Sequence, residues 1–300
     1  MLQTADGVPD LTVSVVVPTH ARPESLGRCI AALARLDYPR RLLEVVVVDD
    51  GSPRPVSLEA PARLALQVIR QQRSGPGAAR NTGVAAASGA VIAFVDDDCE
   101  PEPEWVDRLV RRLEDEPGTV LGGRVVNALT DNPYSEASQA LVSYLYRSYG
   151  ARESARIFFT TNNLALRREA FLAVGGFDPA FRRAAGEDRE FCARCLRAGY
   201  RLAYAPDAVV RHSHELSLRS FWNQQLTYGR EGYRFHRRLA AGRRLELEPL
   251  SFYGRLLAAP FSQGLRRPLR ASALLAVSQV AIASGFVRES LAQRRPPPSA

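Results

Sequence analysis

The segment VIAFVDDD, residues 91–98, decides the fold, because a continuous apolar run is followed at once by Asp96, Asp97 and Asp98. Short apolar runs of this kind are typical of strands in a parallel sheet that is covered on both faces. Ligands of such sheets bind at the carboxyl ends of the strands. Adjacent carboxylates repel one another unless a cation or water compensates them, so the pattern indicates a site for a divalent cation and a diphosphate. The alternative is an acidic loop in water.

Two similar runs precede this segment, LTVSVVV at 11–17 and LLEVVVV at 42–48. Between them, apolar residues at spacings of three and four follow a proline over 23–36, which predicts an amphipathic helix. The small-residue segment GPGAARNTGVAAASG at 75–89 predicts a tightly packed helix that ends at its last glycine. Strands that alternate with helices predict a doubly wound α/β sheet.

The second half of the chain is more mixed. The patterns predict a strand at 119–127, a helix at 134–149, a strand, turn and helix over 158–178, a helix at 186–199 and strands over 202–212. The motif Asp49-Asp50-Gly51-Ser52 follows the strand 42–48 directly. It is either an ordinary turn or a source of carboxylates at the same sheet edge as Asp96.

Two further motifs carry candidate side chains. Glu187 and Asp188 open a helix, where backbone N–H groups keep a carboxylate ionised, so Asp188 could act as a general base. The alternative is a simple pair of acids at a helix start. His212 and His214 end a strand and share one face of it, so one imidazole is a candidate third metal ligand. A surface histidine pair is the alternative.

The charge of the chain is concentrated at one end. All 40 basic residues are arginines, and residues 201–300 hold 16 of them against 6 acidic residues, which accounts for the net charge of +8. Such a basic segment attracts anionic lipid or phosphorylated ligands, or it is a solvated surface. It lacks a basic and aromatic recognition motif, so we expect no nucleic-acid partner.

The cysteines and the start of the chain bear on its compartment. Cys192 and Cys195 form a C-x-x-C without a second metal-binding pair, so we expect half-buried thiols in a reducing compartment. The polar start MLQTADGVPD lacks the apolar core of a signal peptide, so we expect a cytoplasmic protein.

The C-terminal part contains one long apolar segment. Residues 272–287 are apolar over 16 positions and flanked by Arg270 and Arg288, which is shorter than the roughly 20 residues that a bilayer crossing needs. We expect this segment either to lie peripherally on an anionic membrane surface or to pack as a helical cap. The final RRPPPSA predicts a disordered end.

Taken together, these motifs resemble the family-2 glycosyltransferases, over residues 11–232. The matching pieces, in the order of the family, are VSVVVPTHARPESLGRCI, VVVVDDGS, GPGAARNTGVAAASGAVIAFVDDDCEP, NNLALRREAFLAVGGFDPAF, GEDREFCARCLRAGY and VVRHSHELSL. The resemblance implies an α/β fold of GT-A type, a Rossmann-like doubly wound mixed sheet with a helical C-terminal extension. We therefore expect a flexible N-terminus at 1–10, the GT-A domain at 11–232 and a basic, mainly helical extension at 233–300.

The resemblance also implies an activity and a set of site residues. It implies an inverting enzyme that moves a sugar from a nucleoside diphosphate sugar to a hydroxyl of a glycan, a lipid-linked molecule or a small molecule. Uracil is the expected base, with guanine or thymine as the alternatives. The residues that the resemblance implies for binding of the nucleotide-sugar donor are Pro18, Thr19, Arg22, Asp50, Arg80, Asp96 and Asp97. A Mn²⁺ or Mg²⁺ cofactor falls to Asp96, Asp98 and His212, with His214 as a substitute, and proton removal falls to Asp188 beside Glu187.

One departure from the family and two alternatives complete the sequence-based expectations. Processive members carry Q-x-x-R-W, whereas this chain has Gln225 and Arg230 but no R-W, so we expect one sugar per encounter. A sugar-phosphate nucleotidyltransferase would carry a glycine-rich basic loop after the first strand, where this chain has PTHARPES. A non-catalytic carbohydrate-binding protein would not need the full acid set. An NAD-dependent oxidoreductase is disfavoured, because no G-x-G-x-x-G follows that strand.

Overall fold

The computed structural model describes residues 11–58, 61, 64–150, 157–181, 185–239 and 248–293. The expected flexible start at 1–10 and the expected disordered end lie outside these residues. The chain forms two compact units, Met1–Val126 with Glu153–Ser213, and Asn127–Arg152 with His214–Ala300. This division does not coincide with the boundary at residue 232 that the sequence suggested.

The first unit is built on one mixed sheet of eight strands in the order β3-β2-β1-β4-β7-β6-β8-β5. The strands are β1 Val13–Thr19, β2 Leu43–Asp50, β3 Ala65–Gln71, β4 Val91–Phe94, β5 Cys99–Pro101, β6 Thr119–Asn127, β7 Leu164–Arg167 and β8 Arg201–His212. Strands β3, β2, β1 and β4 run parallel, while β7 is antiparallel to β4 and β6. The predicted doubly wound mixed sheet is confirmed.

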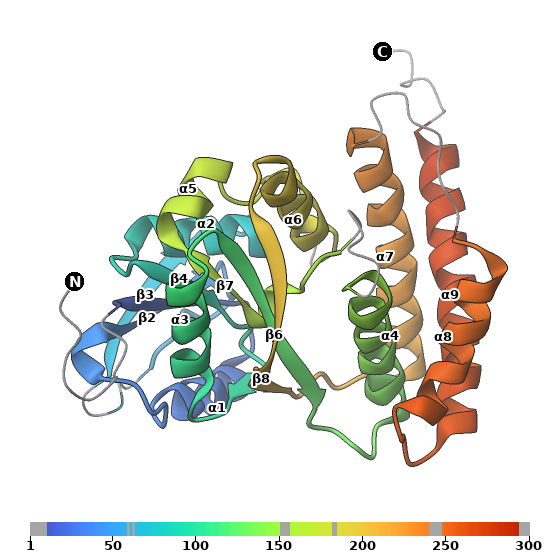
Figure 1. The fold of residues 1–300 in the computed structure, drawn as a ribbon, viewed down its shortest axis with the longest axis horizontal. Coiled ribbons are helices and arrows are strands. Elements are labelled where there is room, and N and C mark those ends of the chain that lie inside the picture. Colours follow the sequence, from blue (N-terminus) through green and yellow to red (C-terminus); the bar gives the residue numbers. More distant parts are fainter. Residues whose placement is uncertain are drawn as a thin grey trace. The chain divides into compact units, whose positions relative to one another are not determined.

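Helices cover both faces of this sheet, as Figure 1 shows. One face packs against α1 Pro23–Leu33 and α3 Trp105–Asp115, and the other against α2 Pro76–Ala86, α5 Arg168–Val174 and α6 Glu187–Arg197. Alternation along β1 explains the two layers, because Val15 and Val17 face α1 whereas Val16 faces α2. Gly83 on α2 is required here, because a Cβ would meet the Val16 side chain.

Most of the predicted elements exist close to the expected bounds, with several differences. The α2 helix stops at Ala86, because the chain must then bring Gly89 against the backbone of Ser14. One continuous strand, β8, replaces the strands expected over 202–212. Strands β3 and β5, helix α3 and the short 3-10 helices η1 Arg40–Leu42 and η2 Thr161–Asn163 were not predicted. All four cysteines are fully buried, so the expectation of half-buried thiols was wrong for Cys192 and Cys195.

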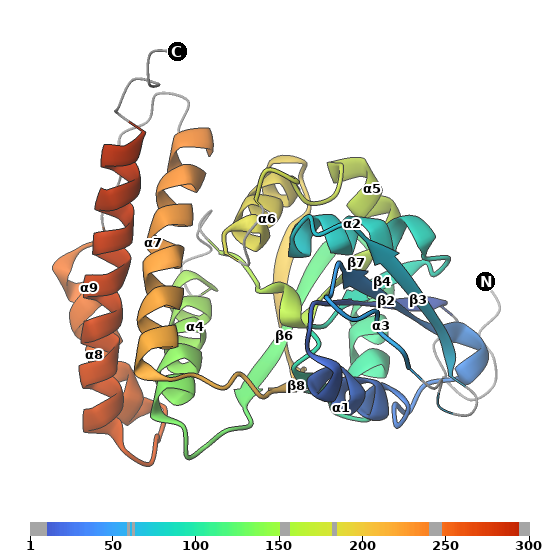
Figure 2. The ribbon, with the colours of Figure 1, turned by 180° about the vertical axis from the view of Figure 1, so that it is seen from behind.

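The second unit is a group of helices, α4 Pro133–Gly150, α7 Leu218–Leu239, α8 Leu250–Ser262 and α9 Pro268–Ala292 (Figure 2). Helices α7 and α9 cross at Gly229 and Gly285, where a Cβ on either residue would collide with the backbone of the other helix. Arg234 on α7 bonds to the nearly buried Glu231 and Glu289 at 2.9 and 2.8 Å. Close packing and a network of charged side chains therefore hold α7 and α9 together.

The apolar segment expected at 272–287 belongs to a longer helix. Helix α9 has 25 residues and extends beyond the apolar run of 16 residues at both ends, so the helix is long and apolar enough to cross a membrane by length and composition. Only 28% of its most apolar stretch is buried within the structure. Its exposed side chains therefore need an explanation of their own.

Candidate active site

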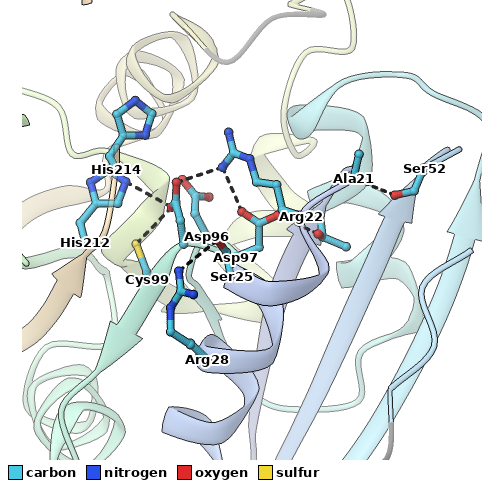
Figure 3. Close-up of polar contacts among 12 residues, drawn as sticks. Ala21, Arg22, Ser25, Arg28, Ser52, Asp96, Asp97, Cys99, His212 and His214 are labelled. Atoms are coloured by element: carbon cyan, nitrogen blue, oxygen red, sulfur yellow. Dashed lines mark hydrogen bonds and ion pairs between the residues drawn. The ribbon is translucent and has the colours of Figure 1, made fainter. Parts of the chain in front are cut away.

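Asp97 is the innermost of the three aspartates that follow β4. Its carboxylate accepts hydrogen bonds from Thr19 Oγ1 at 2.7 Å and from Arg22 Nη1 at 3.1 Å. Burial raises the pKa of Asp97 to about 6, although Thr19 and Arg22 act to lower it. Asp97 therefore ties the loop after β1 to the end of β4, as Figure 3 shows.

Asp98 lies between a guanidinium and an imidazole. Its Oδ2 is 2.9 Å from Arg22 Nη1, and its Oδ1 is 3.2 Å from Nε2 of His212 at the end of β8. The pairing of Cys99 in β5 with His212 in β8 produces this approach. Burial lowers the pKa of His212, but the hydrogen bond to Asp98 and the negative charges of Asp98 and Asp96 together outweigh burial and raise the pKa above 6.5.

Two side chains of the first unit could hold a metal ion. Asp98 and His212 each offer one ligand atom, and these two atoms lie 3.2 Å apart, whereas His214, the expected substitute, begins the second unit. Carboxylate oxygen and imidazole nitrogen suit divalent ions such as Mn²⁺. Arg22 supplies the positive charge beside Asp98, and its side chain is half-exposed. The donor set therefore fits a divalent cation.

Arg80 on α2 joins two of the predicted acid motifs. Its Nη2 is 2.6 Å from Asp96 Oδ1 and its Nη1 is 3.2 Å from Glu187 Oε1, at the start of α6. Arg80 and Glu187 are both nearly inaccessible, at 3% exposure each. Burial and the neighbouring Asp188 raise the pKa of Glu187 to about 8, and Arg80 opposes them. One buried guanidinium thus holds the end of β4 and the start of α6 together.

Asp188 lies in the first turn of α6, which begins after Gly186 with φ of 90°. Its Oδ1 accepts a hydrogen bond from its neighbour's backbone, Arg189 N, at 2.7 Å. Burial raises the pKa of Asp188 above 3.8, while this backbone hydrogen bond acts to lower it. The carboxyl group therefore combines raised basicity with a fixed orientation, as a general base requires.

The loop that follows β1 lies at the same edge of the sheet. Pro18 and Thr19 end β1, and Ala21 after them has φ of 56°, held by a bond from Ala21 N to Ser52 Oγ at 2.8 Å. Such a φ is rare for a residue with a Cβ and marks a constrained loop. Neither Ala21 nor this role of Ser52 was identified from the sequence, because a backbone angle leaves no residue-type signal.

Asp50 is already engaged by the protein backbone. Its two oxygens accept bonds from Ser74 N at 2.8 Å and Gly75 N at 2.9 Å, and Oδ1 also accepts from Gln71 Nε2. The carboxylate therefore fixes the loop that leads into α2 and Arg80. Most of the predicted site residues lie at or just after the carboxyl ends of β1, β2, β4 and β8: Pro18, Thr19, Arg22, Asp50, Asp96, Asp97, Asp98 and His212. Arg80 on α2 joins this edge to Glu187, which is followed by Asp188 at the start of α6.

A pocket of about 330 Å³ lies elsewhere in the first unit. It is lined by residues at the opposite ends of the strands, including Thr12 before β1, Ala90 before β4 and Arg167 at the end of the antiparallel β7. None of the acids described above lines it. The pocket is therefore separate from the candidate active site.

The sheet order and the helices on both faces define a fold of the GT-A type. Residues 14–187 match the profile described as Glycosyl transferase family 2. The chain belongs to this family.

Named relatives agree with this assignment. A pre-mycofactocin glycosyltransferase of Mycobacterium tuberculosis is 34% identical over 227 residues, which cover 72% of this chain and 46% of the relative. Glycosyltransferase AglE of Haloferax volcanii is 30% identical over 210 residues, 67% of this chain and 66% of that protein. The chain thus spans about half to two thirds of the length of these relatives.

A solved structure shares the fold. The mannosyltransferase PcManGT from Pyrobaculum calidifontis, in complex with GDP-Man and Mn²⁺, has a TM-score of 0.58 and 21% identity, with 97% of this chain and 83% of that chain covered. GalNAc-T7 with UDP, GalNAc and Mn²⁺ has a TM-score of 0.56 and 18% identity, covering 83% of this chain and 54% of that chain. These likenesses concern the GT-A fold.

Proposed function

We propose that this glycosyltransferase moves one sugar from a nucleoside diphosphate sugar to an acceptor hydroxyl, with a divalent cation and with inversion at the sugar carbon. The observation that carries the proposal is the bridge by Arg80, which links the acid run after β4 to the acids that open α6. Cation binding and proton removal are thereby assigned to neighbouring positions on one sheet edge. The alternatives of a nucleotidyltransferase or a non-catalytic binder do not agree with the family.

Asp98 and His212 are the proposed holders of the cation, with Asp96 as a third ligand. The 3.2 Å approach of Asp98 to His212 supports the first two. Asp96 gives one oxygen to Arg80 and keeps the other for the cation or the ribose. A bound Mn²⁺ or Mg²⁺ would supply positive charge that stabilises the departing diphosphate.

The donor contacts are proposed for the residues around the first loop. Pro18, Thr19 and Arg22 would hold the nucleoside, with Arg22 moving from Asp97 and Asp98 towards the donor. Asp50 would act through the loop that it fixes, and by a contact to the base. Uracil is the base that we propose, and guanine is the alternative, since UDP and GDP-Man accompany the two structures of similar fold.

Asp188 is the proposed general base. Its raised pKa and oriented carboxylate support removal of the proton from the acceptor hydroxyl. Attack by that hydroxyl opposite the departing diphosphate inverts the sugar carbon, and no enzyme nucleophile is needed. Glu187 would position the helix start through Arg80.

Features of the second unit support a proposal about the number of sugars added and the class of acceptor. The missing R-W after Gln225 supports addition of a single sugar. The arginine-rich second unit favours a lipid-linked acceptor at the cytoplasmic face of a membrane, over a free glycan or small molecule.

A panel of nucleotide sugars, incubated with the full chain and either Mn²⁺ or Mg²⁺, tests the proposal. We expect release of a nucleoside diphosphate from one donor, with loss of this release on chelation. Release of pyrophosphate would indicate a nucleotidyltransferase, and no release from any donor, with or without acceptor extracts, would contradict the proposal.

A further inference from the structure

One side of α9 exposes apolar side chains along its whole length. The exposed positions recur at spacings of three and four residues, at Leu269, Ala273, Ala276, Val280, Ala283, Val287 and Leu291. Leu269 is 76% exposed and Val280 is 59% exposed. A helix on a protein surface normally presents polar residues to water, so a continuous apolar stripe indicates contact with a further apolar phase.

Helix α8 carries a second stripe of the same kind. Its exposed apolar positions are Leu250, Gly254, Leu257, Ala258 and Phe261, which recur at helical spacing, and Leu250 is 88% exposed. The two helices are in contact next to these stripes, because Ser272 Oγ, adjacent to Ala273, donates a hydrogen bond to the carbonyl oxygen of Leu257 at 2.7 Å. We call these two stripes together the apolar face.

The exposed charges on α8, α9 and the loop between them are all positive. Residues 249–293 contain five arginines, all exposed: Arg255, Arg266, Arg267, Arg270 and Arg288. Their single acidic residue is Glu289, which is buried and bonded to Arg234. Arg266 lies 3.8 Å from Asp131, but a pair of such high exposure contributes little. An anionic partner is therefore the electrostatic complement of this region.

We propose that the apolar face of α8 and α9 inserts into the surface of an anionic membrane, with the surrounding arginines against lipid phosphates. The inference rests on the proposed function, because it gives the lipid-side acceptor a docking surface. Amphipathic helices with arginines beside an apolar stripe lie in this way at the boundary of headgroups and acyl chains.

Two other occupants fit less well. A second copy of the chain would bring like-charged arginines together without an exposed acid on these helices to compensate them. A membrane crossing by α9 would draw in α7, which is held against it at Gly229 and Gly285 and carries the exposed Arg219 and Arg237. Charges of this kind are costly in hydrocarbon, so α9 lies in the surface rather than across it.

Flotation of the full chain with vesicles tests the proposal. We expect binding to phosphatidylcholine vesicles that contain phosphatidylglycerol, little binding to phosphatidylcholine alone, and weakening by salt. Val280→Asp and Phe261→Asp should each reduce binding by about tenfold or more, because each places a charge where apolar area would be buried. Leu172→Asp is the matched control, because Leu172 is 53% exposed on α5 in the first unit.

Three results would overturn the proposal. The first is unchanged flotation of both variants, and the second is resistance of the bound chain to alkaline carbonate, which would indicate a spanning helix. The third is a wild-type dimer in sedimentation that Val280→Asp dissociates, without vesicle binding. Release of nucleoside diphosphate without lipid is measured in parallel, since its absence in the wild type would count against the proposed function and leave the flotation result standing.

Discussion

Asp98 Oδ1 lies 3.2 Å from His212 Nε2, although β4 and β8 are not neighbours in the sheet. The short strand β5 explains this contact. It begins at Cys99, directly after the aspartates, and pairs with the end of β8 so that Cys99 is opposite His212. Three residues of strand pairing therefore bring an oxygen and a nitrogen ligand to one point.

The first prediction concerns this pair. Asp98→Ala and His212→Ala should each weaken binding of a nucleoside diphosphate in the presence of Mn²⁺ by about tenfold or more, because each removes a proposed ligand. Isothermal titration calorimetry with and without Mn²⁺ measures the effect. Asp115→Ala, at an exposed position on α3, is the control, and an unchanged Mn²⁺-dependent affinity of the Asp98 variant would refute its role.

The second prediction concerns the buried guanidinium. Arg80→Met should lower the free energy of unfolding by roughly 3 kcal/mol, because it leaves Glu187 buried without its cationic partner. Urea denaturation measures this change. Arg111→Met breaks an exposed pair with Asp107 and should cost less than about 1 kcal/mol. Equal losses for the two variants would show that Arg80 has no special structural role.

The third prediction is a pH dependence of turnover. A general base must be ionised, and burial raises the pKa of Asp188, so kcat should fall as the pH falls through a value above 3.8. This acidic fall in kcat is assigned to the Glu187–Asp188 pair as a whole, because adjacent carboxyl groups titrate together. The pH profile of diphosphate release at saturating donor measures it. A rate that stays constant down to pH 4, in a protein that remains folded, would be incompatible with this base.

The fourth prediction concerns the thiols. Burial raises the pKa of all four cysteines, which makes the reactive thiolate scarce in the folded protein. We expect no labelling by Ellman's reagent in native buffer and four labelled thiols per chain in urea. Rapid native labelling of Cys192 or Cys195 would show that the C-x-x-C is accessible and support a redox or metal role.

The sheet could be predicted from the sequence where its strands are buried. Strands β1, β2 and β4 are continuous apolar runs, and the runs exist because both faces of these strands are covered. Strand β3 was not predicted, because it lies at the sheet edge with mostly exposed side chains. Strand β5 was not predicted either, since CEP is too short to carry a periodic pattern.

The sequence indicated which residues are candidates for the site, but it did not indicate most of the contacts between them. Aspartates after a strand indicate an ion site, and the structure brings Asp98 to His212. The bridge by Arg80 could not be deduced, because it depends on how α2 and α6 approach β4. The backbone bonds that engage Asp50 were equally hidden, because they depend on the path of the loop at Ser74 and Gly75.

The central claim is that Asp188 removes a proton at the sheet edge where the donor and cation are bound. The most direct measurement is the turnover of Asp188→Asn at saturating nucleotide sugar and Mn²⁺, with donor affinity determined on the same protein. We predict a fall of about a hundredfold or more in turnover with donor affinity retained. Turnover equal to that of the wild type would contradict the account.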